Sequence, residues 1–316
     1  MIKLLSLLQN ENMKIYRRLR TWILIGILVA ISCSFSIISR MTDTGTNEGW
    51  EVRAQARLQS NQAYLEESNR LPVLAQEEIR RSIVLDQYRL EHDIPPSENT
   101  LWGMVLSMSI LIQLVTIFTV VIAADIVAGE FATGTIKLLL IRPAGRAKIL
   151  LSKYISVSMF SLLLLVVLFV SSFLVNGVLY QFSDIGSPYL HVAKDMTVEE
   201  SSMVLHVMST YGLKCIELIM IVTLAFMIST VFRSSSLAIS MSLLFLFLGQ
   251  AITNFVSYWS WGRFWLFANT DLTQYIEGKP LMEGMNMTFS IIVLVAYFLL
   301  FNFLSWTIFQ KRDVAA

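Results

Sequence analysis

The chain has 316 residues, of which 55% are hydrophobic and 15% carry a charge. An ordinary soluble domain is about 45–50% apolar and about 25% charged. The composition therefore excludes an ordinary soluble protein and indicates a protein of the membrane. The 24 Lys and Arg residues nearly balance the 23 Asp and Glu residues, and this net charge of +1 argues against a nucleic-acid partner attracted by bulk charge. The two cysteines lie in apolar runs, which favours neither a disulfide framework nor a thiolate metal site.

Six apolar runs are each long enough to cross the hydrocarbon core of a membrane as a helix. The sequence therefore predicts an all-α integral membrane protein with six transmembrane helices. The expected spans are residues 21–39, 101–124, 154–180, 213–232, 234–262 and 284–310. A basic segment precedes the first span, but this span is too long for a typical signal peptide, so we expect it to remain as an anchor.

The distribution of Lys and Arg predicts how the spans are oriented. The two tails, the loop at residues 125–153 and Arg233 together carry 13 Lys and Arg residues, whereas the short loops opposite, with their borders, carry four. By the positive-inside rule, both termini lie in the cytoplasm. Residues 1–20 and 311–316 are then cytoplasmic, and the extracellular segments are residues 40–100, 181–212 and 263–283.

The outer segments carry signals for further helices. Residues 51–93 are rich in helix-forming residues, and Pro72 stands where a second helix can begin. We therefore expect an extracellular helical hairpin between spans one and two, which is either a solvated cap or a contact for a substrate or partner. Residues 197–200 (Thr-Val-Glu-Glu) fit a capping box, which predicts a helix leading into the fourth span. A short helix is also expected after Asp271.

Lys214 and Glu217 are the only charged residues inside an expected span. Their i,i+3 spacing lets the two side chains pair on one face of a helix, near the outer end of the fourth span. The pair either reaches toward the membrane interface or contributes to a substrate path.

The sequence lacks the motifs of an enzyme. No Gly-x-x-x-x-Gly-Lys-Ser/Thr loop occurs, so this chain does not cradle nucleotide phosphates in the P-loop manner. The three histidines are scattered through outer segments without the spacing of metal ligands. We therefore expect no catalytic residue, no cofactor and no metal in this chain.

The most informative stretch is the cytoplasmic loop at residues 125–153. Gly134 and Thr135 can begin a short helix with leucines as its apolar content, and Arg142 and Pro143 end it. The helix is expected to lie along the inner membrane face. An interfacial loop with basic residues at lipid phosphates is the alternative. The residues expected to present a basic surface before the third span are Arg142, Arg146, Lys148 and Lys153.

The same loop carries a recognisable order of residues: an acidic residue, Glu130, Gly134 with Thr135, a run of leucines, and Arg142 with Pro143 before further basic residues. This order resembles the signature of ABC-2 type transporter permeases. Six spans and cytoplasmic termini are similar to that family, so the resemblance covers essentially the whole chain. Residues 266–275 and 311–313 resemble the bacterial subgroup of bacitracin-type exporter permeases.

The resemblance implies a permease subunit that exports a hydrophobic or amphipathic substrate, such as an antimicrobial peptide, and that supports antibiotic resistance. ATP and Mg would be bound by two copies of a separate ABC ATPase, and a second permease copy or a sister permease would complete the assembly in the bacterial plasma membrane. Residues 1–20 would form a cytoplasmic amphipathic elbow helix. The resemblance assigns coupling to the ATPase to Asp125, Glu130, Gly134, Thr135, Arg142, Pro143 and Arg146.

Two other functions stay open at this stage. The chain could be a membrane sensor or regulator that presents the hairpin at residues 51–93 to an external peptide. Deletion of the hairpin separates this function from transport, because a sensor loses its response entirely whereas a transporter keeps part of its flux. The other alternative is a sodium-type ion exporter of the same architecture, for which a flux of sodium is the discriminating observation.

Overall fold

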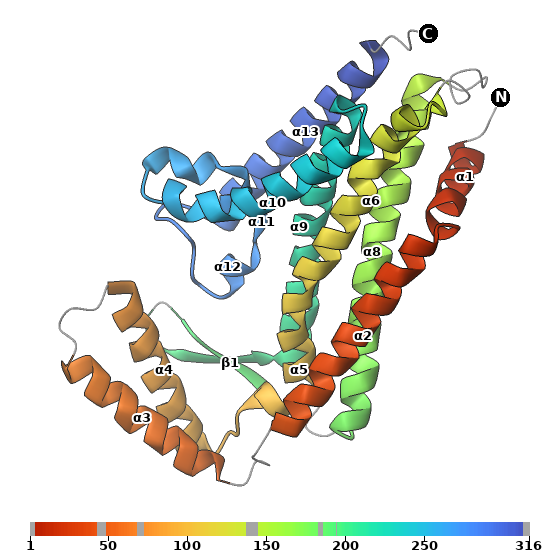
Figure 1. Cartoon of the computed structure of the whole chain (residues 1–316). Helices are drawn as coiled ribbons and strands as arrows, with labels where there is room; N and C mark the ends of the chain where they lie inside the picture. Colours follow the sequence, from red (N-terminus) through yellow and green to blue (C-terminus); the bar gives the residue numbers. More distant parts are fainter. Residues whose placement is uncertain are drawn as a thin grey trace. The chain divides into compact units, whose positions relative to one another are not determined.

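The computed structural model describes residues 4–42, 49–67, 73–136, 145–182, 186–193 and 195–311. Across these ranges the chain is mainly helical, with one two-stranded sheet (Figure 1). Six helical stretches among the described residues are long and apolar enough to cross a membrane. They are Leu19–Thr42, Leu101–Ala132, Arg146–Leu179, Met203–Val231, Ser235–Val256 and Met287–Lys311. The prediction of a mainly helical chain with six such helices is therefore confirmed.

The chain divides into two compact units. Unit 1 consists of Met1–Ile31, Ile110–Phe169 and Tyr211–Ala316, and unit 2 consists of Ser32–Ser109 and Val170–Thr210. Three of the long helices, α2 (Leu19–Thr42), α8 (Arg146–Leu179) and α9 (Met203–Val231), contribute residues to both units.

Unit 1 holds the helices that position the candidate site. Besides its parts of α2, α8 and α9, it contains α1 (Leu4–Tyr16), α6 (Ile112–Ala132), α10 (Ser235–Val256) and α13 (Met287–Lys311). In this unit α1, the end of α6, the start of α8 and the end of α13 lie at the same end (Figure 1). We call this the α1 end of unit 1.

Helix α6 forms the centre of unit 1, because it is apolar around its whole circumference and most of its residues are buried. It packs against α10, whose buried residues recur every three or four positions. Gly249 on α10 allows a close approach, since a Cβ atom there would lie 2.1 Å from the Phe267 ring. Helix α6 ends before Gly134, whose φ of +71° suits the left-handed conformation that commonly follows a helix.

An apolar cluster joins four helices at the α1 end. Val127 of α6, Leu150 of α8, Phe226 of α9 and Phe309 of α13 are buried together with Ile136. These side chains pack parts of α6, α8, α9 and α13 together.

The chain between α10 and α13 is folded into short helical pieces. Helix α10 ends at Val256 rather than at residue 262, and η3 (Ser260–Phe264) and α11 (Leu266–Thr270) follow. The short helix expected after Asp271 is α12 (Thr273–Ile276). These pieces connect α10 to α13 along the chain, and α11 packs against both of these helices.

Unit 2 contains the expected helical hairpin, made of α3 (Trp50–Glu67) and α4 (Val73–His92). It also contains η1 (Ser97–Asn99), α5 (Leu101–Ser107), η2 (Met108–Leu111) in part, and the antiparallel strands β1 (Pro188–Val192) and β2 (Val198–Ser202). The prediction of a helix from Thr197 is wrong. Pairing with β1 satisfies the backbone groups of β2, and α9 begins only at Met203.

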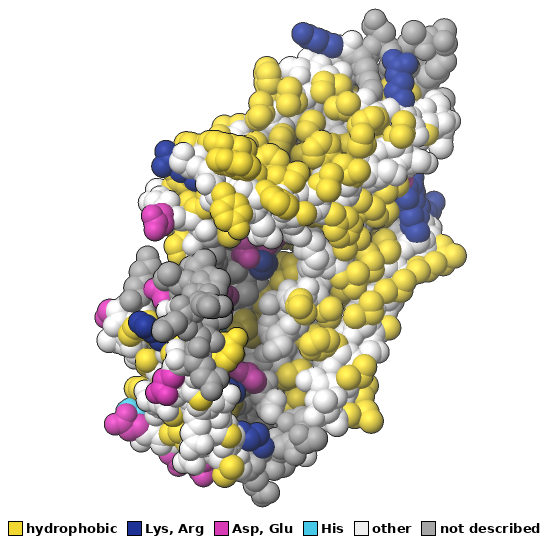
Figure 2. Space-filling view, turned by 60° about the vertical axis from the view of Figure 1, so that its left-hand side comes forward, with side chains coloured by type: hydrophobic (Ala, Val, Ile, Leu, Met, Phe, Trp, Pro, Cys, Tyr) yellow, Lys and Arg dark blue, Asp and Glu magenta, His cyan; other side chains and the backbone are white. Residues whose placement is uncertain are grey.

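Large apolar side chains remain exposed on the long helices. Examples are Trp22 on α2, Val166 on α8, Phe247 on α10 and Leu299 on α13. Figure 2 shows hydrophobic side chains spread over the face that it presents. Apolar surface on this scale is expected where helices contact lipid.

Candidate functional site

Charged side chains that are far apart in the sequence meet at the α1 end of unit 1. We call this set the ionic network. It consists of Glu11, Lys14, Arg18, Arg20, Asp125, Glu130 and Lys153. Glu11 and Lys14 lie in α1, Arg18 lies between α1 and α2, and Arg20 lies at the start of α2, while the other three lie in α6 or α8. The network therefore connects the N-terminal segment to both helices that flank residues 137–144.

Lys153 is the buried centre of the network, because none of its side-chain surface is exposed. Its Nζ donates to Glu11 Oε2 at 2.8 Å and lies 2.6 Å from Glu130 Oε1. Lys14 Nζ contacts the other oxygen of Glu11 and the same oxygen of Glu130, both at 2.8 Å. Positive and negative groups thus alternate around the four side chains, which offsets the cost of removing them from water.

Asp125 holds a second part of the network. Its Oδ2 accepts from Arg18 Nη1 at 2.5 Å and from Arg20 Nη2, and its Oδ1 accepts from the hydroxyl of Ser235. Ser235 is the first residue of α10. One buried carboxylate therefore ties the junction of α1 and α2 to α6 and to the start of α10.

Gly129 leaves the space that this carboxylate occupies. A Cβ atom at Gly129 would lie 2.6 Å from Oδ1 of Asp125, closer than real Cβ contacts allow. Glycine lowers helix propensity, so its presence inside α6 is explained by packing against Asp125. Ser229 of α9 adds a further link, since its hydroxyl accepts from the backbone N–H groups of Val127 and Ala128 at 3.1 Å each.

The junction of α1 and α2 is fixed by local hydrogen bonds. Thr21 donates from its hydroxyl to the carbonyl of Ile15 at 2.6 Å, and Trp22 donates from its indole to the carbonyl of Tyr16 at 2.8 Å. These bonds fix Arg18 in the turn between the two helices and Arg20 in the first turn of α2. The two guanidinium groups are thereby directed to the same carboxylate.

The network shifts the ionisation of the groups on α1. Burial acts to raise the pKa of Glu11, but the charges and hydrogen bonds of Lys153 and Lys14 outweigh burial, so the pKa lies below its ordinary value. Burial acts to lower the pKa of Lys14, but hydrogen bonds to Glu11 and Glu130 outweigh it, so this pKa is raised. Both groups are therefore charged near neutral pH.

The structure places the residues that were assigned to coupling in different surroundings. Asp125 and Glu130 belong to the ionic network, whereas Gly134 and Thr135 follow the end of α6 and are exposed. Thr135 contacts the hydroxyl of Thr133 at 3.0 Å. Arg146 donates from Nη1 to the carbonyl of Gln310 at 3.0 Å, which links the start of α8 to the end of α13. The helix that was expected to begin at Gly134 and Thr135 and to end at Arg142 and Pro143 falls mostly on residues 137–144, which lie outside the described residues.

The expectation that Lys153 belongs to a basic surface is wrong. Its side chain does not contribute to a basic surface, because it is buried between Glu11 and Glu130. The sequence does not indicate most of the pairs that these charged side chains form. The i,i+3 spacing of Glu11 and Lys14 is the one local signal, whereas Lys153 lies 142 positions from Glu11.

A second charged region of unit 1 surrounds Lys214. This polar pocket has a volume of about 350 Å³. Lys214 Nζ donates to Glu217 at 2.8 Å, as the i,i+3 spacing suggested, and it also lies 3.1 Å from Asp271. The sequence analysis did not connect Asp271 with this pair. The polar and charged residues that line the pocket are Gln113, Lys214, Glu217, Gln250, Thr253, Asn254, Thr270, Asp271, Gln274 and Lys279.

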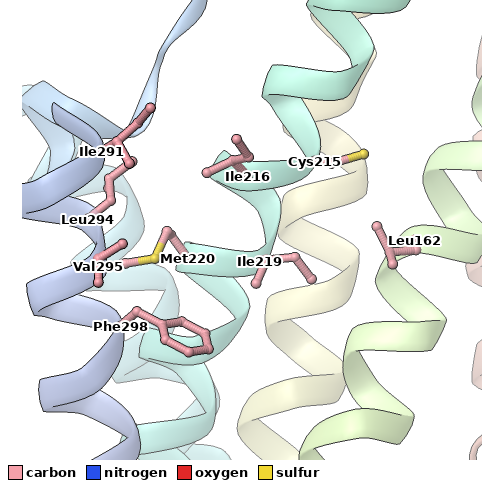
Figure 3. A pocket seen from close by; sticks show the side chains of 9 residues that line it. All are labelled: Leu162, Cys215, Ile216, Ile219, Met220, Ile291, Leu294, Val295 and Phe298. Carbon is pink, nitrogen blue, oxygen red and sulfur yellow. The ribbon is translucent and has the colours of Figure 1, made fainter. Parts of the chain in front are cut away.

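An apolar groove of about 510 Å³ lies between α8, α9 and α13 (Figure 3). Leu162 of α8 faces it from one side, and Ile291, Val295 and Phe298 of α13 face it from the other. The lining exposes almost no polar surface, so the groove can accept an apolar group but offers no charged partner. Among the residues that the structure describes, no group of three or more His, Cys, Asp and Glu side chains is arranged to hold a metal ion.

Comparisons with known proteins identify relatives of the chain. The uncharacterized protein YhcI of Bacillus subtilis is 40% identical over 316 residues, which cover 99% of this chain and all of the relative. The uncharacterized membrane protein YdbK of the same organism is 35% identical over 211 residues, which cover 66% of this chain and 80% of the relative. With the six apolar helices, these relatives indicate a multi-pass membrane protein.

The family assignment differs from the one that the loop motif suggested. Residues 77–315 match a family whose description reads "Protein of unknown function (DUF2705)". Assignment to the ABC-2 type permeases is therefore wrong. The motif is short, and Gly-Thr followed by leucines and Arg-Pro also suits any short helix that ends at a membrane surface. The match covers more than half of the chain, so the chain belongs to the DUF2705 family.

Proposed function

We propose that the chain is the membrane subunit of an ATP-driven exporter, with ATP hydrolysed on a separate ABC ATPase. The ionic network is the observation that supports this proposal most directly. Force from a cytoplasmic ATPase must reach the spans through a stiff connection. The network is such a connection in our proposal, because ion pairs that are largely buried join α1, α6 and α8, and residues 137–144 lie between α6 and α8 in the sequence.

The charge distribution supports a cytoplasmic position for this end of unit 1. Positive-inside counting assigns both tails and the loop between α6 and α8 to the cytoplasm. In Figure 1 the α1 end gathers α1, the end of α6, the start of α8 and the end of α13, which belong to or border these segments. We propose that an ATPase binds at residues 137–144, and a bacterial plasma membrane is the expected location.

The exported molecule is proposed to be hydrophobic or amphipathic, such as an antimicrobial peptide. Unit 1 offers two kinds of surface for such a molecule, namely the apolar groove beside α13 and the polar pocket around Lys214. Lys214 and Glu217 remain the residues proposed for a substrate path. Two ATPase copies and a second permease copy, identical or not, would complete the transporter.

The test is the ATP hydrolysis of the purified complex with variants of the network. We expect Glu130→Gln and Arg142→Ala to lower hydrolysis by about tenfold, since each removes a group at or beside the coupling segment. Lys148→Ala removes a charge from an exposed side chain of the same region and serves as the control. Thermal unfolding of each variant separates loss of coupling from loss of folding.

If hydrolysis is unchanged in both variants, the network and its neighbouring segment do not transmit force. If deletion of residues 51–93 abolishes a response to an external peptide while no ATPase is bound, the chain is a sensor rather than a transporter. A flux of sodium without flux of peptides would instead identify an ion exporter.

A further inference from the structure

A second hollow extends the apolar groove toward the α1 end of unit 1. It has a volume of about 400 Å³ and is formed by the same three helices, α8, α9 and α13. The two hollows meet at Tyr154 and Phe298, which line one hollow each and whose ring centroids are 6.4 Å apart. We call the two hollows together the α8–α13 groove.

The α8–α13 groove has the length of a lipid acyl chain. Its lining runs along α13 from Ile291 to Trp306, which is about 22 Å at a rise of about 1.5 Å per helical residue. One leaflet of a membrane contains about 15 Å of hydrocarbon, half of a core of about 30 Å. The groove is therefore long enough to hold one acyl chain of a lipid through the full depth of its leaflet.

The polarity of the lining changes along the groove in the same order as in a lipid. The hollow farther from the α1 end exposes almost no polar surface (Figure 3). The hollow nearer to the α1 end adds Asn302, Ser305 and the half-exposed indole of Trp306. Tryptophan is enriched where hydrocarbon meets headgroups, because its ring is apolar and its N–H donates to polar groups. The groove thus passes from an acyl-chain environment to an interfacial one.

The interfacial end of the groove is positively charged. Arg146 precedes Ala147 of the lining and donates to the carbonyl of Gln310, so its guanidinium reaches from the start of α8 to the end of α13. Lys148 and Lys311 belong to the same two helix ends, and both are exposed. The first turn of α8 and the last turn of α13 contain no acidic residue. A guanidinium matches the geometry of a phosphate, so this end complements an anionic headgroup.

We propose that the α8–α13 groove binds one acyl chain of an anionic phospholipid, whose phosphate lies at Arg146. A zwitterionic lipid fits the apolar part equally well, but its own ammonium offsets the attraction of its phosphate to Arg146 and the two lysines. The site therefore selects anionic lipids from the leaflet nearest the α1 end. The inference goes beyond the proposed function and does not rest on it, because the lipid binds whether or not an ATPase drives the chain.

The test is photo-crosslinking of lipids to the purified full chain in nanodiscs of phosphatidylcholine, without any ATPase. The two tracers are phosphatidylglycerol and phosphatidylcholine that carry the same diazirine on one acyl chain. Peptide mass spectrometry identifies the labelled residues. Helix α2 is the internal reference, because Trp22 and Ile23 expose apolar side chains there and line neither hollow.

We expect phosphatidylglycerol to label Val295 and Phe298 about tenfold more than phosphatidylcholine does, and the two tracers to label α2 equally. Arg146→Gln should lower this preference about fivefold, which is the effect of one basic group at a membrane surface. The amide of this variant can still donate to the carbonyl of Gln310. Arg146→Lys keeps the charge and should keep most of the preference.

A second variant fills the groove without changing its charges. Val295→Trp places a large ring in the lining, so labelling of the groove by both tracers should fall to the level of α2. Leu300→Trp is the matched control, since Leu300 is also exposed on α13 but lines neither hollow. This control should leave the labelling of the groove unchanged.

Equal labelling of the groove by the two tracers would overturn the inference, as would an unchanged preference in Arg146→Gln. An equally strong preference at α2 would show a general attraction of anionic lipid to the chain, and would also overturn it. Groove residues that neither tracer labels, while α2 is labelled normally, would show that a second copy or another protein covers the groove, which overturns the inference as well. Because the assay contains no ATPase, each of these results leaves the coupling proposal standing.

Discussion

The ionic network of unit 1 and the ion pair of the hairpin in unit 2 are both made of salt bridges, but they join residues at very different distances in the sequence. Arg57 of α3 donates to both oxygens of Asp86 of α4, at 2.7 Å and 2.6 Å. These residues are 29 positions apart on consecutive helices, whereas Glu11 and Lys153 of the network are 142 positions apart. The hairpin pair reinforces helices that the chain already joins, but the network attaches an N-terminal helix that the chain connects only to α2.

The two regions also differ in how much water reaches the charges. The side chains of Arg57 and Asp86 are 46% and 2% exposed, whereas the side chain of Lys153 has no exposed surface and those of Glu11 and Glu130 are 4% and 12% exposed. A pair with one exposed partner contributes less to stability than a buried set, in which removal of one partner leaves uncompensated charge. We therefore expect the loss of Lys153 to cost more than the loss of the hairpin pair.

The largest effect is expected for Lys153→Met. The change leaves Glu11 and Glu130 without their shared buried cation, and we expect unfolding to become easier by about 3–5 kcal/mol. Thermal unfolding in mild detergent measures the loss. Lys148→Met, five positions earlier on the exposed surface of α8, is the control and should leave the midpoint unchanged. Equal midpoints for the two variants would contradict a structural role of the network.

A smaller effect is expected for Gly129→Ala. The added methyl group would meet the Asp125 carboxylate, which Arg18, Arg20 and Ser235 hold in place, so we expect a cost of about 1–3 kcal/mol. Gly26→Ala on α2 is a matched control, because nothing lies within 4 Å of a Cβ atom there. The same unfolding assay compares the two variants. A Gly129→Ala protein as stable as the control would show that the carboxylate is free to move.

Acidification should weaken the attachment of α1. The pKa of Glu11 is lowered, so its stabilising effect is present above its ordinary value of 4.5 and is lost as pH falls through the lower folded-state value. Lys14, whose pKa is raised, loses its contribution only when pH rises through a value above 10.5. The protection of α1 amides against hydrogen exchange, taken relative to the intrinsic exchange rate at each pH from pH 6 to pH 3, should therefore fall on the acid side. Glu11→Gln should exchange rapidly at every pH, and a pH-independent wild type would argue against the ion pairs.

The smallest effect is expected for Asp86→Asn in the hairpin. The Asp86 side chain is buried, but its partner Arg57 is half exposed and keeps access to water, and the amide oxygen of the variant can still accept from Arg57, so we expect a loss of about 1 kcal/mol, confined to α3 and α4. Hydrogen exchange of the two helices is the measurement. A loss as large as that of Lys153→Met would erase the distinction between the two regions.

Much of the fold follows from the sequence because apolar length and helix signals are local. Apolar runs predicted the six long helices, and residues 51–93 predicted the hairpin of α3 and α4. The spacing of Lys214 and Glu217 predicted their pairing. Strand β2 was missed, because a capping-box pattern at Thr197 competes with cross-strand pairing to β1, which is not local.

The sequence predicts less of the candidate site than of the fold. Asp125 and Glu130 were singled out from a loop motif, but their partners in α1 and α8 are distant in sequence. Basic residues near a membrane are ordinarily assigned to lipid phosphates, and nothing local marks Lys153 as buried. Asp271 likewise joins Lys214 only through the packing of α11 and α12 beside α9 and α10.

The central claim is that this chain is driven by a separate ATPase, and the composition of its purified complex tests it most directly. A tagged chain is extracted from its host membrane in mild detergent, and the proteins that remain bound are identified and quantified. We predict one ATPase subunit per chain, retained by Lys148→Ala and reduced in Glu130→Gln. A chain that purifies alone from several mild detergents, without ATP hydrolysis, would contradict the claim.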